Sequence, residues 1–185
     1  MIIGMDAGQS VAGPFLLACA LLVVAGVGKI THPGPTRAAV LAAGLGVPRF
    51  VVVGFGIVEL SAGGAGAVFG GRAAMAVAAC YVLLTVFAVC LLVRAPTAPC
   101  ACLGSSSSVV TRTHVVLDGA AVAVALVAAF GQSPFAQLSG RWVSGAVFAV
   151  LVLCGVQLAA LALEALPELT GAIKEGVDVS KEAKR

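Results

Sequence analysis

The stretch of sequence that decides the fold is FVVVGFGIVELSAGGAGAVFGG, residues 50–71, which lies between Arg49 and Arg72. It is almost entirely apolar, and its single charged residue is Glu59. An apolar run of about 20 residues can cross the ~30 Å hydrocarbon core of a bilayer as one α-helix. The run is continuous and lacks the two-residue alternation of a barrel strand. Residues 50–71 therefore predict a transmembrane helix.

Similar apolar stretches recur along the chain on both sides of this one. Each is bounded by charged or polar residues and has the length of a membrane-spanning helix. They are Ala7–Gly28, Ala73–Val93, Gly119–Gly140 and Trp142–Leu163. Gly131–Pro134 is typical of a turn, so the stretch over 119–140 has the least definite boundary. We predict an all-α, polytopic transmembrane helix bundle with a four-helix core and a fifth helix.

The composition agrees with a membrane protein. Hydrophobic residues make up 61% of the chain and charged residues only 10%, whereas soluble chains carry about 25% charged residues. This excludes a soluble globular enzyme, a disordered chain and a nucleic-acid binder. The net charge of +3 is too small to indicate a polyanionic partner. The lipid bilayer is therefore the predicted surroundings, and a prokaryotic plasma membrane is the predicted location.

Two segments outside the spans complete the predicted organisation. Residues 32–35, His-Pro-Gly-Pro, are typical of a turn. The stretch after them, over 36–45, predicts a short helix at the membrane interface with Pro35 near its first turn. Residues 164–185 mix acidic and basic side chains. We predict one helix bundle over residues 1–163 and a charged, solvent-exposed tail over 164–185.

The positions of the cations predict an orientation. With five spans, every Lys and Arg except Arg72 and Arg141 lies on the same side of the membrane as the tail. The positive-inside rule places that side in the cytoplasm. The segment between Arg94 and His114 would then be cytoplasmic too.

The six cysteines fall into two groups. Four lie within apolar spans, where a thiol packs as a small and inert hydrophobe; these are Cys19, Cys80, Cys90 and Cys154. The other two, Cys100 and Cys102, lie between spans in APCACLG, residues 98–104, directly before four serines. The second group is the one that indicates chemistry.

Cys100 and Cys102 are the candidate catalytic residues. Two thiols separated by one residue can bond only in a small strained ring, because alternate Cα atoms of an extended chain are ~6.5 Å apart. Strain raises the reduction potential, so such a pair is labile and suited to exchange with a partner thiolate. A structural disulfide and two inert loop cysteines stay open as alternatives. A metal site is disfavoured, because two thiolates and one His leave a tetrahedral site short of a ligand.

His114, Asp118 and Arg112 are the candidate supporting residues. His114 and Asp118 are four residues apart, which places them on one face of a helix within hydrogen-bonding reach. Such a pair could hold an imidazole as a base or stabilise it as a cation, and Arg112 is a further cation that could favour a thiolate. The alternative is a polar cluster at a helix start, where the helix dipole favours an acid.

Glu59 is unusual because it lies about ten residues, or ~15 Å, into a predicted span. A charged and unpaired carboxylate at that depth costs several kcal/mol. Glu59 must therefore be protonated or paired inside the bundle, and the candidate partners are Lys29, Ser61 and Tyr81. A functional role for this intramembrane acid and a purely structural interhelical bond both stay open.

Two features in the first half of the chain resemble DoxX-like membrane proteins. Gly26-Val27-Gly28-Lys29 followed by His32-Pro33 is similar to the Gly-x-x-Lys…Pro signature of those proteins. Glu59 matches the acid that they usually carry in the second span.

The region with the thiols resembles the MauE family, which is named for methylamine utilisation. Cys100-Ala101-Cys102-Leu103-Gly104 and the later segment 114–118 are similar to the Cys-x-Cys-Phe-Gly element and the segment that follows it in MauE. Two departures are visible: Leu103 replaces the usual Phe, and Asp118 stands where an Arg-Asn pair is common. Together the matches cover Gly26 to about Ala129.

The resemblance implies a redox-associated membrane protein that works with a thioredoxin-like partner outside the cytoplasm, during maturation of a secreted or membrane protein. Cys100 and Cys102 would exchange disulfides or relay electrons, while Glu59 and Lys29 would be polar positions inside the bundle. This role places the thiols outside the cytoplasm, whereas the charge count places them inside. The orientation therefore stays open.

A second function class also stays open. The chain could be a non-catalytic accessory subunit that packs against a larger membrane complex. The sequence therefore leaves undecided whether the protein is an enzyme, here a thiol–disulfide oxidoreductase. We expect no cofactor and no metal.

Overall fold

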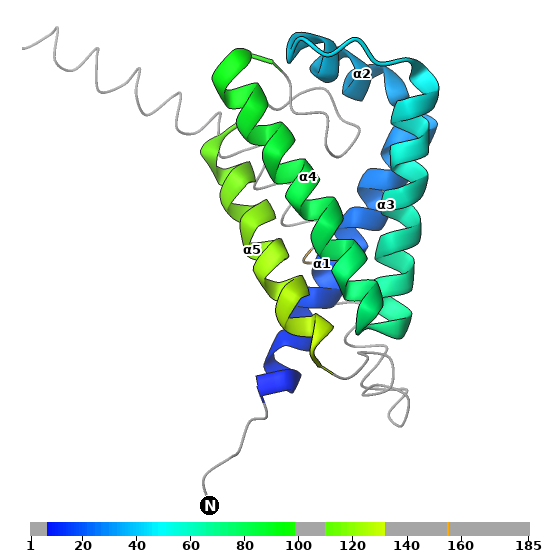
Figure 1. The fold of residues 1–185 in the computed structure, drawn as a ribbon, viewed down its shortest axis with the longest axis vertical. Coiled ribbons are helices and arrows are strands. Elements are labelled where there is room, and N and C mark those ends of the chain that lie inside the picture. Colours follow the sequence, from blue (N-terminus) through cyan, green and yellow to red (C-terminus); the bar gives the residue numbers. More distant parts are fainter. Residues whose placement is uncertain (1–6, 99–109, 132–154, 156–185) are drawn as a thin grey trace, which may run out of the picture.

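The computed structural model describes residues 7–98, 110–131 and 155. Five helices follow one another along the described ranges (Figure 1). They are α1 (Ala7–Thr31), α2 (Pro33–Ala42), α3 (Arg49–Phe69), α4 (Arg72–Arg94) and α5 (Arg112–Ala129). The described ranges hold no strand, and the predicted all-α class is confirmed.

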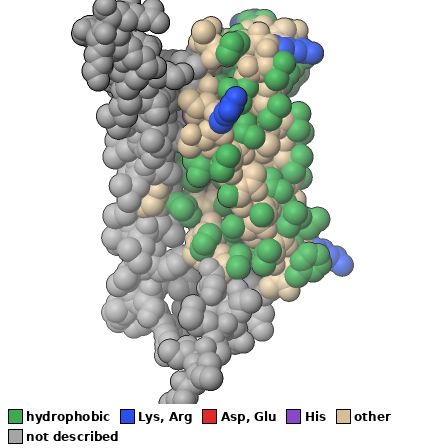
Figure 2. Space-filling view, turned by 90° about the vertical axis from the view of Figure 1, so that its left-hand side faces the viewer, with side chains coloured by type: hydrophobic (Ala, Val, Ile, Leu, Met, Phe, Trp, Pro, Cys, Tyr) green, Lys and Arg blue, Asp and Glu red, His purple; other side chains and the backbone are tan. Residues whose placement is uncertain are grey.

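Four of these helices are long and apolar enough to cross a membrane. They are Val11–Thr31 within α1, and the whole of α3, α4 and α5. In the described part of the face in Figure 2, apolar side chains are spread along the whole length of the bundle, and the few Lys or Arg side chains lie toward its two ends. Such a surface matches lipid tails, and the predicted multi-pass membrane bundle is confirmed in its described part.

Successive long helices run in opposite directions, so each is antiparallel to the next (Figure 1). The sharpest connection is Gly70-Gly71 between α3 and α4, where φ is 58° and 49°. Side chains with a Cβ rarely adopt these angles, which is why two glycines make this turn. The short α2 lies across the opposite end of the bundle, where α1 ends and α3 begins (Figure 1).

Two predicted boundaries are wrong. The fourth span begins at Arg112 and not at Gly119, because Thr111 and His114 form a capping box that starts α5 before the apolar run. Arg112, His114 and Asp118 therefore lie within the helix. The interfacial helix begins at Pro33, which suits the first turn because proline has no N–H to leave unsatisfied there.

Two predicted segments lie outside the described residues. They are the fifth span, Trp142–Leu163, and the charged tail over 164–185. Gly155 is the one described position among them, and it is helical. A Cβ added to Gly155 would lie 3.1 Å from Cδ1 of Leu17 in α1.

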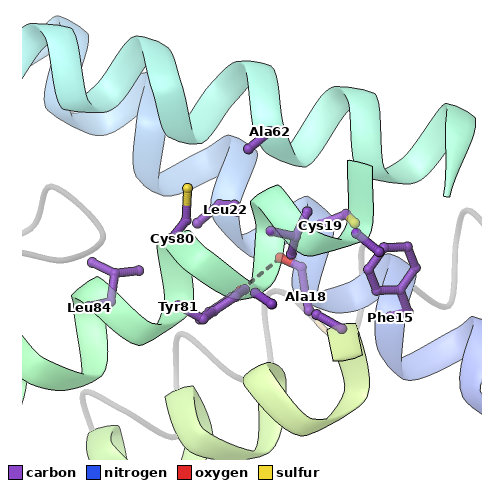
Figure 3. Packing of buried hydrophobic residues seen from close by; sticks show 12 residues of the cluster. Phe15, Ala18, Cys19, Leu22, Ala62, Cys80, Tyr81 and Leu84 are labelled. Atoms are coloured by element: carbon purple, nitrogen blue, oxygen red, sulfur yellow. Dashed lines mark hydrogen bonds between the residues drawn. The ribbon is translucent and has the colours of Figure 1, made fainter. Parts of the chain in front are cut away.

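The main core lies among α1, α3, α4 and α5 (Figure 3). Phe15, Cys19 and Leu22 from α1 pack there against a larger set of α4 side chains. Tyr81 of α4 donates a hydrogen bond from its hydroxyl to the Ala18 carbonyl, at 2.7 Å (Figure 3). This bond satisfies the phenol inside the bundle and links α4 to α1.

Three of the four cysteines expected to be packing residues lie in the described ranges. Cys19 and Cys80 are buried and free, which confirms their prediction as packing residues. Cys90 is half-buried and also free. Cys154 lies outside the described residues.

Candidate functional site

The strongest polar contact in the described ranges joins α1 to α3. Lys29 lies in the last turn of α1, and Glu59 lies near the middle of α3. Their side chains are 2% and 0% exposed. The Lys29 Nζ donates a hydrogen bond to Glu59 Oε1 at 3.0 Å and lies 2.8 Å from Oε2. Of the partners considered for Glu59, the structure therefore places Lys29 against it.

The geometry of antiparallel helices explains why these two residues meet. Side chains on a helix tilt toward its N-terminus. Because α1 and α3 run in opposite directions, Lys29 and Glu59 tilt toward each other along the interface. Ser61 is exposed, and Tyr81 donates its hydroxyl proton to Ala18, so neither takes this place.

Glycines let the two helices come close enough for the pair to form. A Cβ added to Gly56 would lie 2.9 Å from the Gly26 carbonyl oxygen and 3.0 Å from Cβ of Lys29. A Cβ on Gly26 would lie 2.6 Å from the Gly56 carbonyl oxygen. The same holds deeper in the bundle, where a Cβ on Gly63 would lie 2.7 Å from the Cys19 carbonyl oxygen. Small residues thus make the tight α1–α3 contact that lipid surroundings favour.

The surroundings of the ion pair are apolar. The Lys29 ammonium lies 5.8 Å from the centre of the Phe55 ring, within the range of a cation–π contact. Glu59 Oε2 accepts no hydrogen bond of acceptable angle from the described residues, although Nζ is only 2.8 Å away. The second contact of the carboxylate is therefore Coulombic. Together the two charges form a neutral pair, which offsets much of the cost of burying each one.

His114 is held at the start of α5 by its own helix cap. The Thr111 side chain accepts a hydrogen bond from the backbone of His114, and Thr111 N–H donates to His114 Nδ1 at 3.2 Å. A backbone N–H can only donate, so Nδ1 is the acceptor of this bond. His114 therefore serves as a capping residue of α5.

His114 and Asp118 also line one cavity. It has a volume of about 230 Å³ and lies between α1, α4 and α5, with Tyr81 in its wall. The rest of its lining is almost entirely apolar. Arg112 is exposed on the first turn of the same helix. The three predicted supporting residues therefore share the first two turns of α5, and two of them face a common cavity.

Cys100 and Cys102 lie outside the described residues, but both ends of their segment are described. Val110 N–H donates a hydrogen bond to the Ala98 carbonyl at 3.4 Å, which closes the base of the segment. Ala98 and Val110 are both buried, in a second core cluster that also contains Ala39 of α2 and Ala43, the residue directly after this helix. The α2 helix therefore lies against the base of the thiol segment.

Arg94 connects the same elements through a contact that the sequence reasoning missed. Its Nη1 donates to the Ala43 carbonyl at the end of α2, at 3.2 Å. Carbonyls at a helix C-terminus lack intrahelical partners and carry partial negative charge, so a guanidinium suits this place. Gly44 follows with φ 85°, which lets the chain leave the helix. No sequence signal pairs Arg94 with a carbonyl about fifty residues earlier (94 minus 43), because the contact is purely tertiary.

The described residues contain no group of three or more His, Cys, Asp and Glu side chains arranged to hold a metal ion. Their polar chemistry is concentrated in the Lys29–Glu59 pair and in the first turns of α5. Lys29 lies in the last turn of α1, next to α2, and the first turns of α5 follow directly after the base of the thiol segment.

The chain matches one family model over most of its length. The model is described as methylamine utilisation protein MauE, and it matches residues 10–131. The matched range includes the Lys29–Glu59 pair, both thiols of the 99–109 segment and the whole of α5. No curated protein and no solved structure matches the chain.

Proposed function

Because the chain belongs to the MauE family of methylamine utilisation proteins, we propose that it is a thiol–disulfide exchange protein of the membrane. Cys100 and Cys102 are the reacting pair, and the partner is a thioredoxin-like protein. The exchange serves the maturation of a secreted or membrane protein. A prokaryotic plasma membrane is the proposed location.

The observation that carries the proposal is the closed base of the thiol segment. Ala98 and Val110, the described residues on either side of the segment, are buried and hydrogen-bonded to each other. They lie at the same end of the spans, because α4 ends just before Ala98 and α5 begins just after Val110. This placement supports the proposal that Cys100 and Cys102 can be reached by a soluble domain, unlike a thiol buried in a span such as Cys19.

The chemistry proceeds through a mixed disulfide. One thiolate of the pair attacks a disulfide sulfur of the partner and releases one partner thiolate. The second thiolate then attacks the sulfur of its neighbour in the mixed disulfide and releases the other partner thiolate. The Cys100–Cys102 pair loses two electrons, the partner disulfide gains them, and the two thiol protons end on the partner. The reverse sequence reduces the pair and oxidises the partner.

The supporting residues have modest roles in this proposal. Arg112, exposed at the start of α5, supplies positive charge that favours a thiolate. His114 holds the cap of α5 through its Nδ1, which keeps the helix start fixed directly after the thiol segment. Asp118 lies one turn further along α5 and lines the same cavity as His114.

Single serine substitutions test the proposal in intact cells. One of the two variants, Cys100→Ser or Cys102→Ser, keeps the attacking thiol and lacks the thiol that resolves the mixed disulfide. In that variant a reductant-sensitive adduct with a thioredoxin-like protein should accumulate on non-reducing gels. The other variant should form no adduct. Cys90→Ser is the matched control, because Cys90 is half-buried within α4 and should leave adduct formation unchanged.

The same cells decide the alternative function and the orientation. Stable co-purification with a larger membrane complex, together with full function in both serine variants, would establish an accessory subunit and contradict thiol exchange. Labelling with a membrane-impermeant thiol reagent, with and without prior reduction, reports which side the pair faces and whether it is oxidised.

A further inference from the structure

Three arginine side chains gather around the loop that joins α2 to α3. Arg94 Nη1, from the end of α4, donates to the Ala43 carbonyl at the beginning of this loop, at 3.2 Å. Arg37 Nε, from α2, donates to the Val47 carbonyl near the end of the loop, at 3.4 Å. Arg49 follows directly after the loop, as the first residue of α3. These three side chains, which only the fold brings together, are called the arginine patch below.

The guanidinium groups of the patch are held in place and remain accessible. All three arginines are exposed. Each bond to the loop uses one of the five N–H donors of its guanidinium and fixes where that group lies. Guanidinium groups bind phosphate oxygens through two parallel hydrogen bonds. Three of them around one short loop therefore favour a ligand that carries a phosphate group.

The described part of the chain does not balance the charge of the patch. Its two acidic residues are Glu59 and Asp118. Glu59 is paired with Lys29 inside the bundle, and Asp118 lines the cavity between α1, α4 and α5. A local excess of positive charge attracts an anionic ligand.

Exposed apolar side chains accompany the arginines. Phe50 directly follows Arg49 and is 75% exposed. Val93 directly precedes Arg94 and is 78% exposed. On α2, Leu41 lies one helical turn after the arginine of that helix and is 50% exposed. A phospholipid offers both a phosphate for the arginines and acyl chains for these side chains, which neither free phosphate nor an acidic protein surface does.

We propose that the arginine patch binds the phosphate group of an anionic phospholipid, whose acyl chains pack on the exposed apolar side chains beside it. The short α2 lies across the end of the bundle, as a helix at the level of the lipid headgroups does (Figure 1). The site does not involve Cys100 or Cys102 and does not depend on the proposed exchange chemistry.

Lipid titration followed by native mass spectrometry tests the proposal. The full-length protein in neutral-detergent micelles is titrated with phosphatidylglycerol or with phosphatidylcholine of identical acyl chains. Both probes carry a phosphate, but only phosphatidylglycerol has a net negative charge. We expect phosphatidylglycerol to bind at least about tenfold more tightly, because each arginine near an anionic lipid contributes about a fivefold gain.

Matched variants separate the patch from other cations at helix ends. Arg49→Gln is the mildest variant, because Arg49 is exposed and holds neither loop carbonyl. It should weaken phosphatidylglycerol binding about fivefold, and Arg49→Lys, which keeps the charge, should recover most of that loss. Arg72→Gln is the control, because Arg72 is also exposed at a helix start, near the exposed Phe69, but at the opposite end of the bundle from α2. The control should leave binding unchanged.

Three results would overturn the proposal. They are equal affinity for the two lipids, equal affinities of Arg49→Gln and Arg72→Gln for phosphatidylglycerol, and binding of deacylated glycerophosphoglycerol as tight as that of the whole lipid. The last result would assign the patch to a free phosphate compound.

A further outcome would assign the patch to an acidic protein and also overturn the proposal. In that outcome, Arg49→Gln keeps the lipid preference but forms less mixed disulfide with the partner. None of the lipid measurements involves the thiols, so their failure leaves thiol exchange standing, and failure of thiol exchange leaves the lipid site standing.

Discussion

The α1–α3 contact and the contacts of α5 show two ways of holding a helix inside a membrane. Between α1 and α3, glycines bring the backbones together and the Lys29–Glu59 pair joins them. In α5, the buried residues are His114 and Ala125, and Thr111 and His114 form a capping box at the start of the helix. Lipid tails are as apolar as the core, so apolar burial alone gives little preference for one partner helix. The ion pair and the close glycine contacts therefore give α1 and α3 a specific way to recognise each other, whereas the cap fixes where α5 begins.

The largest effect is expected from removing one member of the ion pair. Glu59→Ala leaves the Lys29 ammonium buried without its counter-ion, and breaking a buried pair in this way costs about 3–5 kcal/mol. Lys29→Met combined with Glu59→Leu removes both charges and should recover most of that loss. The free energy of unfolding in mixed micelles, followed by circular dichroism, measures both. Equal losses in the single and double variants would show that the pair contributes shape and not charge balance.

A smaller effect is expected when the close backbone contact is changed. Gly56→Ala places a methyl group 2.9 Å from the Gly26 carbonyl oxygen, so the helices must separate, at a cost of about 1–3 kcal/mol. Gly54→Ala is the matched control on the same helix, because nothing lies within 4 Å of a Cβ there. The control should be neutral or stabilising by up to about 1 kcal/mol, since alanine favours helix. The same unfolding measurement compares them, and similar losses would contradict the close-contact interpretation.

A further effect is expected at the helix cap that starts α5. Thr111→Val removes the cap of α5 and should cost about 1 kcal/mol. Hydrogen exchange should increase in the first turn of α5 and stay unchanged in α1 and α3. Thr113→Val, at an exposed position of the same turn, is the control. A loss of protection that reached α1 and α3 would mean that α5 is as strongly coupled to the bundle as they are to each other.

The smallest effect is expected at Tyr81, which links α4 to α1. Tyr81→Phe removes one hydrogen bond to the Ala18 carbonyl, and such bonds in membranes contribute about 0.6 kcal/mol on average. Thr85→Val removes a bond within α4 only and should have no measurable effect on interhelical stability. If Tyr81→Phe lowered the free energy of unfolding as much as Glu59→Ala, a single hydrogen bond would hold two helices together as strongly as the ion pair, which would contradict this ranking.

The spans could be predicted from sequence because each is an uncharged run between charges, and only length and polarity decide whether such a run can cross a bilayer. The start of α5 could not be placed in this way, because Thr111 and His114 begin the helix with a cap that does not depend on hydropathy. Glu59 was recognisable as an anomaly by its depth alone. The sequence left three candidate partners for Glu59, because the choice depends on how α1 is rotated about its own axis relative to α3.

The sequence by itself determined the class of the molecule, the number of its described spans, the resemblance to MauE and the short set of residues with chemistry. Polarity along the chain is sufficient for the class and the spans, because the bilayer is a uniform solvent that separates apolar from polar segments. The resemblance and the residues with chemistry come from short motifs and residue types, which can also be read without a structure. Only the tertiary structure decided that Lys29 neutralises Glu59, that Arg94 caps α2 beside the base of the thiol segment, and that the arginine patch gathers around one loop. Each of these depends on how helices rotate and approach one another. A Cβ added to Gly26, Gly56 or Gly63 would lie only 2.6–2.9 Å from a backbone oxygen of the other helix, so these glycines set that approach, and hydropathy carries no information about it.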